Sequence, residues 1–310
     1  NMMYCEKNVF IDFPVKGYIH GTNIREVFIR KPLSKPMRFL RKLPFFSKFI
    51  SNTKEIDNWT DYCKNANNII LFDTYSHYAE YCEEIEKAVS TESRLILYLL
   101  NPVFFSDDYK LLSSRWEIWT FMEEDARKYG LKYGATFYNP LLLDHTKTLP
   151  TSKQTSDLLF IGTDKGRKNF ILHLKDQLKA YGIRCDFRIV DNFKSLFSRV
   201  YSREVDYVKL CQLTNNTHAI LDVVQKAQSG LTLRIMEGLL FNKKIVTTNQ
   251  FLSENKDFRN CSNIFILNQN NITGLQTFLK KPTQEYPLNI KKKYSFDEWL
   301  ERLINKEEAK

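Results

Sequence analysis

The residues with the clearest chemical potential follow an apolar run that predicts a buried strand at Ala219–Val224. A polar turn then leads into a predicted helix, Leu231–Phe241, which we expect to open at Gly230. Unpaired amides and the helix dipole favour an anion such as a diphosphate at such a turn. Gly230, Arg234 and Glu237 stand at i, i+4 and i+7 and share one helix face, which places a carboxylate within reach of a ribose diol. The spacing therefore predicts a nucleotide-sugar site.

We expect this turn and helix to supply most donor-binding residues, namely Gln228, Ser229, Gly230, Leu231, Thr232, Arg234 and Glu237. A purely structural alternative is that the glycine only starts the helix. Glu237 lies in an otherwise apolar helix, where an unpaired carboxylate is costly, so an i,i+3 ion pair with Arg234 is the alternative to a ribose contact.

A second loop joins a predicted strand at Leu158–Ile161 to a predicted helix at Arg167–Tyr181. Loops at the carboxyl edge of a parallel sheet are where ligands bind in such folds. Basic side chains there can neutralise a diphosphate leaving group as its charge develops. We therefore add Gly162, Thr163, Lys165 and Arg167 to the donor-binding residues; the alternative is an ordinary solvated helix start.

A catalytic base is expected in the first half of the chain, because glycosyl transfer needs a group to take the acceptor's hydroxyl proton. Asp73 follows the apolar run Ile69–Phe72 and ranks first, and His77 in the next turn and His20 in an earlier loop are weaker choices. For Asp73 the structural alternative is a helix N-cap.

Two stretches of the chain resemble the donor-site region of bacterial cell-surface polysaccharide glycosyltransferases, which build lipopolysaccharide and capsule on the GT-B fold: Gln225-x-x-Gln228-Ser229-Gly230-Leu231-Thr232-Leu233-Arg234-x-x-Glu237-Gly238-Leu239 and Lys243-Lys244-Ile245-Val246-Thr247-Thr248-Asn249. Leu158–Arg167 is similar to the first strand and loop of that family's C-terminal domain. The resemblance implies a nucleotide-sugar-dependent transferase that holds its donor mainly with the second domain. Better-known members carry two glutamates eight residues apart, but Ser229 stands eight before Glu237 here, so only the ribose-binding carboxylate carries over.

Strand-length apolar runs alternate with helical segments along the 310 residues, the pattern of a parallel sheet with covering helices. We predict an α/β protein with two Rossmann-like domains facing each other across a cleft, as in GT-B enzymes. The predicted division is an acceptor-side domain at 1–140, a linker at 141–156, a nucleotide-sugar-binding domain at 157–294 and a C-terminal helix at 295–310, in which Trp299 can serve as an anchor.

The net charge of +10 calls for an anionic partner, and nucleic acid, anionic lipid and phosphorylated substrate all qualify. The segment Arg30–Lys54 holds eight basic and no acidic residues among several phenylalanines, which favours docking on an anionic membrane surface or holding a phosphate-bearing acceptor. A basic surface loop is the alternative. Because these residues form no recognisable nucleic-acid module, we expect no nucleic-acid partner, although a nucleic-acid-binding protein and a catalytically silent nucleotide-sugar-binding scaffold stay as competing hypotheses.

No Asp-x-Asp pair is present, so we expect a metal-independent reaction without a cofactor, the nucleotide-diphosphate sugar being the donor substrate. No Gly-x-Gly-x-x-Gly follows any predicted strand, which disfavours a dinucleotide-dependent oxidoreductase. The six cysteines are scattered, no apolar run approaches the ~20 residues that span a bilayer, and no signal-peptide pattern is present. These features indicate a cytoplasmic enzyme, peripheral on the inner face of the bacterial inner membrane.

Overall fold

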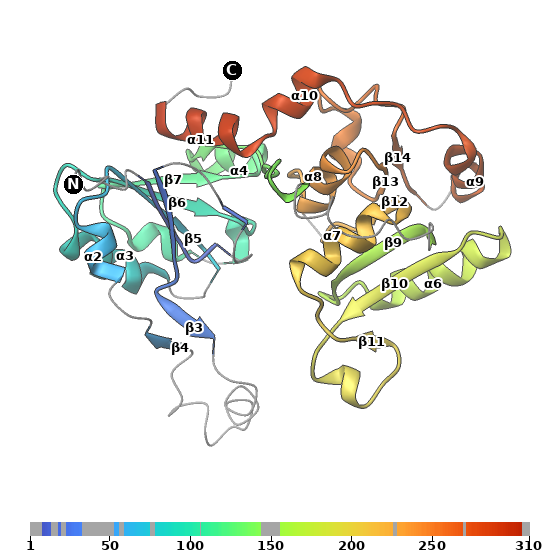
Figure 1. Cartoon of the computed structure of the whole chain (residues 1–310), viewed down its shortest axis with the longest axis horizontal. Helices are drawn as coiled ribbons and strands as arrows, with labels where there is room; N and C mark the ends of the chain where they lie inside the picture. Colours follow the sequence, from blue (N-terminus) through green and yellow to red (C-terminus); the bar gives the residue numbers. More distant parts are fainter. Residues whose placement is uncertain are drawn as a thin grey trace. The chain divides into compact units, whose positions relative to one another are not determined.

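The computed structural model describes residues 8–13, 18–19, 23–32, 53–55, 59–74, 78–105, 107–143, 156–225, 228–268 and 271–305. The chain divides into two compact units, one of Asn1–Thr120 with Lys128–Lys132, the other of Phe121–Arg127 with Tyr133–Lys310. Residues Phe121–Arg127 and 133–140, which the sequence assigned to the first domain, thus belong to the second unit. Each unit contains one six-stranded sheet with helices (Figure 1), and the predicted α/β class with two Rossmann-like domains is confirmed.

The sheet of the first unit has the strand order β2-β1-β5-β6-β7-β8. Its strands are β1 (Asn8–Ile11), β2 (Ile24–Val27), β5 (Asn68–Phe72), β6 (Arg94–Leu99), β7 (Trp116–Thr120) and β8 (Lys132–Tyr133). The pairs from β2 through β7 run parallel. The direction of progression reverses between β1 and β5, and such a reversal opens a crevice at the carboxyl ends of the two strands.

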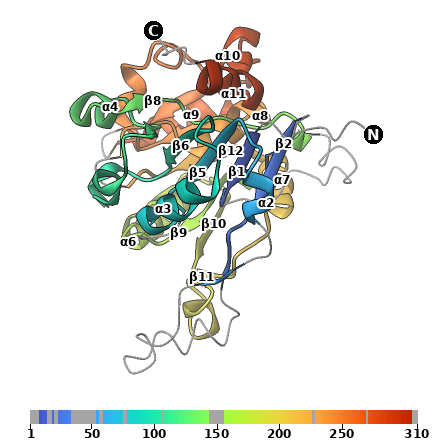
Figure 2. The same ribbon diagram turned by 90° about the vertical axis from the view of Figure 1, so that its left-hand side faces the viewer.

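Helices of the first unit cover one face of this sheet. Helices α2 (Trp59–Cys63) and α3 (Tyr78–Ala88) lie against it in both views (Figures 1 and 2) and share its buried apolar cluster. Alternate strand residues point to the other face, where Phe10, Phe72 and Tyr98 form a row of contacting rings. The remaining described elements of the first unit are β3 (Arg30–Pro32), which pairs with β4 (Thr53–Glu55), and the 3₁₀ turns η1 (Val103–Phe105) and η2 (Asp108–Leu111).

The sheet of the second unit is parallel throughout, in the order β11-β10-β9-β12-β13-β14. Its strands are β9 (Ser156–Thr163), β10 (Cys185–Val190), β11 (Tyr201–Ser202), β12 (Thr217–Asp222), β13 (Lys244–Thr247) and β14 (Ile264–Ile266). Counted along the chain this is 3-2-1-4-5-6, the strand order of dinucleotide-binding folds, whose ligand crevice lies between strands 1 and 4. Here those strands are β9 and β12.

Helices cover both faces of the second sheet. Helices α6 (Lys168–Ala180) and α9 (Ile272–Lys280) share an apolar cluster with residues of β9, β12 and β13 such as Val246. The neighbouring residue Ile245 points the opposite way, toward Gly238 of α8 (Leu233–Leu240), so α8 covers the other face. The other described elements assigned to this unit, in whole or in part, are α4 (Glu123–Tyr129), η3 (Lys194–Leu196), α7 (Tyr207–Asn215), η4 (Gln250–Ser253), α10 (Leu288–Lys293) and α11 (Phe296–Asn305).

The sequence also predicts a helix at Glu123–Tyr129, from the acidic residues of its first turn, and α4 has these bounds. An apolar run predicts a strand at Ala135–Tyr138, and this is wrong, because the described residues show a single bridge there, from Tyr138 to Ser295. A helix predicted at Asp107–Ser113 is instead the short 3₁₀ turn η2. The C-terminal helix packs through Trp299, whose ring centroid lies 4.2 Å from that of Phe137.

The described residues also bear on membrane spanning and on disulfide bonds. No helix in the described part of the chain is long and apolar enough to cross a membrane. The cysteines placed by the structure, Cys63, Cys82, Cys185, Cys211 and Cys261, carry free thiols.

A buried lysine joins β13 to α9. Lys244 is fully buried, and its Nζ donates to the carbonyls of Phe278 and Leu279 at 2.5 and 3.1 Å and to that of Lys281. These carbonyls lie at the end of α9, where the helix dipole favours a cation. Burial and the neighbouring charge of Lys281 lower the pKa of Lys244. The three carbonyls replace hydrogen bonds that the ammonium group would make to water.

Replacing this lysine should destabilise the second unit. In Lys244→Met the carbonyls lose a charged donor while staying buried, so the free energy of unfolding should fall by about 3 kcal/mol, measured by urea denaturation. The control is Lys280→Met, an exposed lysine in the last turn of the same helix. Equal midpoints for the two variants would contradict the assigned role.

Candidate functional site

The two loops predicted to bind the donor follow β9 and β12. Between these two strands the order in which successive strands join the second sheet reverses. Arg167 connects them: its guanidinium donates to the carbonyl of Thr163 at 2.7 Å and to that of Val223. Burial lowers the pKa of Arg167 from its ordinary value. Arg167 was predicted to bind phosphate, and here its described hydrogen bonds join the loops that follow β9 and β12.

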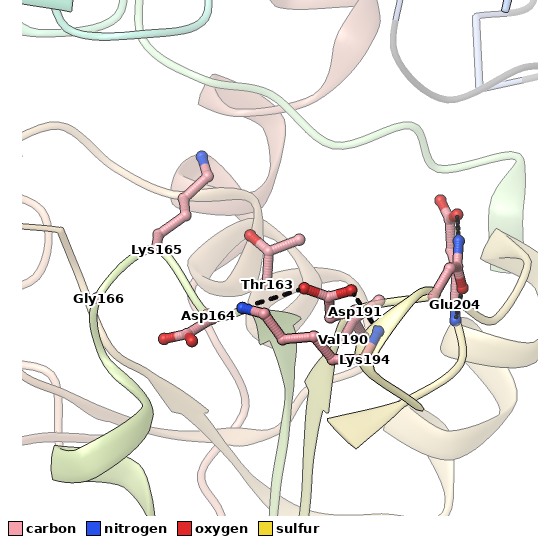
Figure 3. Close-up of a pocket in the computed structure, with 9 residues that line it drawn as sticks. Thr163, Asp164, Lys165, Gly166, Val190, Asp191, Lys194 and Glu204 are labelled. Atoms are coloured by element: carbon pink, nitrogen blue, oxygen red, sulfur yellow. Dashed lines mark hydrogen bonds and ion pairs between the residues drawn. The ribbon is translucent and has the colours of Figure 1, made fainter. Parts of the chain in front are cut away.

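A pocket of about 520 Å³ opens beside the loop after β9 (Figure 3). It is lined by Thr163, Asp164, Lys165, Gly166, Val190, Asp191, Asn192, Lys194 and Glu204. Lys165 and Gly166 have φ angles of 41° and 80°, so the chain turns back tightly there and presents the lysine at the rim. Of the predicted residues in this loop, Thr163 and Lys165 line the pocket, whereas Gly162 and Arg167 lie beside it.

The loop before α6 supplies a carboxylate, Asp164, beside the basic residues at the start of that helix. Asp164 accepts hydrogen bonds from the backbone amide of Lys168 and the hydroxyl of Tyr201, both at 3.1 Å. On the far side of the pocket, Asp191 accepts from two amides of its own turn, and its carboxylate lies 3.4 Å from the ammonium of Lys194. These contacts lower the pKa of Asp191. The pocket thus combines the ammonium groups of Lys165 and Lys194 with carboxylates that hydrogen bonds hold in place.

The turn after β12 is organised by a buried carboxylate. Asp222 accepts hydrogen bonds from the hydroxyls of Thr232 and Thr247 at 3.0 and 2.8 Å. Burial raises its pKa, and the nearby guanidinium groups of Arg234 and Arg167 oppose that rise. One side chain therefore joins the end of β12, the end of β13 and the start of α8.

Helix α8 begins two residues later than predicted, and its N-cap is Thr232, not the glycine. The Thr232 hydroxyl accepts from the amide of Ile235 at 3.4 Å. Gly230 is buried, and a Cβ there would lie 2.5 Å from the ring and 2.9 Å from the carbonyl oxygen of Phe121. The expectation that the helix opens at Gly230 is therefore wrong, and tight packing against Phe121 accounts for the glycine.

The rest of the predicted turn is held by polar contacts. The Gln228 side chain accepts from the amide of Gln225 at 3.4 Å, and the Ser229 hydroxyl donates to Glu124 at 3.4 Å. The carbonyl of Gly230 accepts from Asn249 at 3.1 Å, and the carbonyl of buried Leu231 accepts from Thr136 at 2.6 Å.

Arg234 and Glu237 form the internal ion pair that was considered above as the alternative to a ribose contact. Arg234 Nη1 lies 2.5 Å from Glu237 Oε2. Neither oxygen of Glu237 accepts a hydrogen bond from the described residues. The Glu237 side chain is only 3% exposed. Burial raises its pKa to about 7, Arg234 opposes the rise and Asp222 adds to it. Glu237 thus retains unused acceptor capacity behind Arg234.

The predicted base Asp73 lies at the carboxyl end of β5, beside the reversal in the first sheet. Its carboxylate accepts from the amides of Leu100 and Asn101 at 2.6 and 3.3 Å and from the Asn101 side chain at 3.2 Å. Burial raises its pKa to about 6, and these hydrogen bonds oppose the rise. Asp73 therefore bridges the ends of β5 and β6; residues 75–77, whose amides a helix cap would engage, lie outside the described residues. His77 and His20 lie outside the described residues.

Both sheets share a feature that, apart from Asp73, was not predicted: an aspartate at or just after the end of a strand. These residues are Asp12, Asp73, Asp164, Asp191 and Asp222. Asp12 has a φ of 57° and accepts from the amide of Ile29 at 3.1 Å, while its carbonyl accepts from Thr74 at 2.6 Å. An aspartate ending an apolar run was the available signal.

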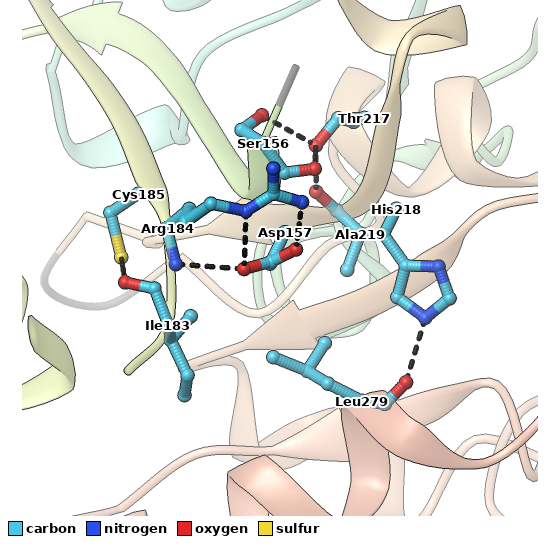
Figure 4. A network of polar contacts seen from close by, with 9 residues as sticks. All are labelled: Ser156, Asp157, Ile183, Arg184, Cys185, Thr217, His218, Ala219 and Leu279. Carbon is cyan, nitrogen blue, oxygen red and sulfur yellow. Dashed lines mark hydrogen bonds and ion pairs between the residues drawn. The ribbon is translucent and has the colours of Figure 1, made fainter. Parts of the chain in front are cut away.

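A second polar network, at the amino ends of β9 and β12, joins strands and involves none of the predicted site residues (Figure 4). Arg184 donates to Asp157 at 2.7 Å, and the hydroxyls of Ser156 and Thr217 lie 3.0 Å apart. His218 Nε2 lies 2.7 Å from the carbonyl oxygen of Leu279. Among the described residues, no group of three or more His, Cys, Asp or Glu could hold a metal ion.

Comparison with known proteins gives a distant structural likeness. No protein family matches the chain, and no curated protein matches it in sequence. Among solved structures, it is similar to a UDP-forming α,α-trehalose-phosphate synthase from Burkholderia xenovorans, with 11% identity and a TM-score of 0.49 over 78% of this chain and 74% of that one.

If Gly230 is required for packing, adding a methyl group there should destabilise the protein. Gly230→Ala should lower the free energy of unfolding by about 2 kcal/mol, because both the ring and the backbone of Phe121 obstruct the new Cβ. The control is Gly274→Ala in α9, where the new Cβ meets Phe265 at an ordinary 3.7 Å. A Gly230→Ala protein of unchanged urea midpoint would show that the glycine serves something other than packing.

Glu237 should give the fold a defined pH dependence. Its folded-state pKa of about 7 exceeds the ordinary 4.5, so its contribution to stability is fully present below about pH 4.5 and is lost as the pH rises to about 7. Relative to Glu237→Gln, the wild type should lose about 3 kcal/mol across that window. Urea midpoints measured from pH 4.5 to 8 test this, with exposed Glu301→Gln as the control. Parallel curves for wild type and Glu237→Gln would contradict it.

Proposed function

We propose that the protein is a glycosyltransferase that moves a sugar from a nucleotide-diphosphate donor to a growing bacterial surface glycan. The observation that carries the proposal is the 3-2-1-4-5-6 strand order of the second sheet. It brings the two loops singled out by the family resemblance to the reversal point between β9 and β12, where such folds bind nucleotides. The pocket beside the first of these loops gives a ligand room to enter.

The donor's diphosphate is assigned to the rim of this crevice. Lys165 supplies a cation from the loop after β9, and Arg234 supplies one from the first turn of α8. The amides of Leu233 and Arg234 precede the first helical hydrogen bond, and with the helix dipole they favour an anion. Arg167 and Asp222 hold the rim in position. Glu237 retains its proposed ribose contact, which requires Arg234 to turn from the ion pair toward the diphosphate.

In the transfer step the bond between the sugar's anomeric carbon and the diphosphate oxygen breaks, and a bond to the acceptor oxygen forms. The diphosphate leaves with the electron pair, and the cations at the rim stabilise its charge without a metal ion. In an inverting reaction the acceptor's hydroxyl proton passes to Asp73. A pKa of about 6 leaves that carboxylate mostly ionised at neutral pH and close to the range suited to a base.

The acceptor is assigned to a lipopolysaccharide core, a capsule chain or a lipid-linked intermediate. This part of the proposal rests on the family resemblance and the net charge of +10. The basic segment Arg30–Lys54 is its proposed contact with the anionic inner face of the membrane; residues 33–52 lie outside the described structure.

Nucleotide binding provides the test. Uridine, guanosine, cytidine and adenosine diphosphates are added in turn, and the melting temperature of the protein is measured. One of them should raise it, because a ligand that binds only the folded state stabilises that state. Lys165→Ala should weaken the affinity for that nucleotide about tenfold, since an exposed cation is lost from the diphosphate.

Lys179→Ala is the control, because Lys179 is exposed at the opposite end of α6. Absence of a shift with every nucleotide would refute the donor site. A shift that Lys165→Ala leaves unchanged would refute the role of the loop. Nucleotide binding without turnover of any nucleotide sugar would favour the silent scaffold over the enzyme.

A further inference from the structure

Several exposed apolar side chains of the second unit gather in the connection between β10 and β11. Four side chains in this connection are exposed: Phe193 by 38%, Leu196 by 59%, Phe197 by 77% and Val200 by 41%. The connection includes η3 and extends beyond the edge strand β11 of the sheet (Figure 1). We call these four residues the apolar tip.

The apolar tip is a folded structure. Asp191 accepts from the amides of Phe193 and Lys194 at 3.0 and 2.9 Å, and the amides of Ser195 and Ser198 donate to backbone carbonyls at 2.9 Å. The rings of Phe193 and Phe197 meet edge to face with centroids 5.4 Å apart. The hydrogen bonds therefore hold a conformation that presents large apolar side chains to solvent, a pattern that marks an interaction surface.

Basic residues are interleaved with the apolar tip. Residues 191–204 contain Lys194, Arg199 and Arg203 against the acids Asp191 and Glu204. Lys194 is paired with Asp191, and Glu204 accepts from the Asn192 side chain, whereas Arg199 and Arg203 are exposed and have no acidic partner among the described residues. The surface that presents the apolar side chains thus carries two exposed arginines, which suit a partner that is both apolar and anionic.

An anionic lipid bilayer meets both requirements. Aromatic and aliphatic side chains enter the boundary between headgroups and acyl chains, while arginines contact lipid phosphates. A second copy of this chain fits less well, because a twofold contact would set the same arginines against each other. Nucleic acid also fits less well, since Leu196 and Val200 are aliphatic and offer no ring on which a base can stack.

We propose that the apolar tip inserts into an anionic membrane surface, with Arg199 and Arg203 binding lipid phosphates. This contact is distinct from the basic segment Arg30–Lys54, and it requires neither nucleotide nor sugar transfer. Its failure would leave the nucleotide-binding test of the proposed function unaffected.

Co-sedimentation of the full chain with vesicles tests the proposal. Vesicles of phosphatidylcholine containing phosphatidylglycerol should bind the protein, and vesicles of phosphatidylcholine alone should bind it weakly. Phe197→Ser combined with Leu196→Ser should lower the partition coefficient at least about tenfold, because two apolar side chains no longer enter the bilayer. Leu288→Ser is the matched control, as Leu288 is 81% exposed on α10.

Tryptophan fluorescence locates the contact. The native residues Trp59, Trp116, Trp119 and Trp299 are all buried, so a tryptophan added at an exposed site can report a change of environment there. Emission of Phe197→Trp should shift to shorter wavelength with anionic vesicles, and emission of Leu288→Trp should not. Arg199→Gln with Arg203→Gln should reduce both the binding and its sensitivity to salt.

Three results would overturn the proposal. The first is vesicle binding in which Phe197→Trp emission stays unshifted, which would assign the membrane contact to another segment. The second is a lower oligomeric mass for the Phe197→Ser and Leu196→Ser protein without lipid, which would make the tip an interface between copies of the chain. The third is binding of nucleic acid at the apolar tip by a protein that binds anionic vesicles no better than vesicles of phosphatidylcholine alone.

Discussion

The candidate site of the second unit depends on the buried carboxylate of Asp222. It lies at the end of β12, and it accepts hydrogen bonds from Thr232, which caps α8, and from Thr247, which ends β13. A carboxylate removed from water is costly unless hydrogen bonds and charges compensate it. Its two threonine partners and the nearby arginines supply that compensation. The start of α8, and with it Arg234, is thereby fixed relative to the sheet edge.

The two units solve the same physical problem in similar ways. Parallel strands end together, so several loops must turn at one edge, and each brings backbone amides that need acceptors. Aspartates at or just after the strand ends provide these acceptors, as Asp73 does for Leu100 and Asn101 and Asp191 does for Phe193 and Lys194. Carboxylates that hold loops at a ligand-binding edge are also positioned for chemistry. Asp73 can therefore be both a structural bridge and a candidate base.

Basic side chains of the second unit lie near these strand-end aspartates. The strand-end aspartates of the second unit, Asp164, Asp191 and Asp222, are engaged by hydroxyls, amides and Lys194. Lys165 lies at the rim of the pocket, and Arg234 is partly exposed. The edge of the sheet can therefore attract an anion even though carboxylates line it. Farther along the same unit, Arg199 and Arg203 accompany exposed apolar side chains, so positive charge is present at two surfaces of different chemistry.

The sequence by itself determined the α/β class and most strands and helices of the second unit, because strand-length apolar runs and amphipathic segments are local signals. It also identified the loops after β9 and β12. Only the tertiary structure decided what individual residues do there. Gly230 is explained by Phe121, more than a hundred residues away. Thr232 replaces it as the N-cap of α8, and its hydroxyl donates to Asp222, which also accepts from Thr247. Long-range packing and buried hydrogen bonds leave no periodic signature in the chain, so the roles of Arg167, Asp222 and Glu237 depended on knowing which strands are neighbours.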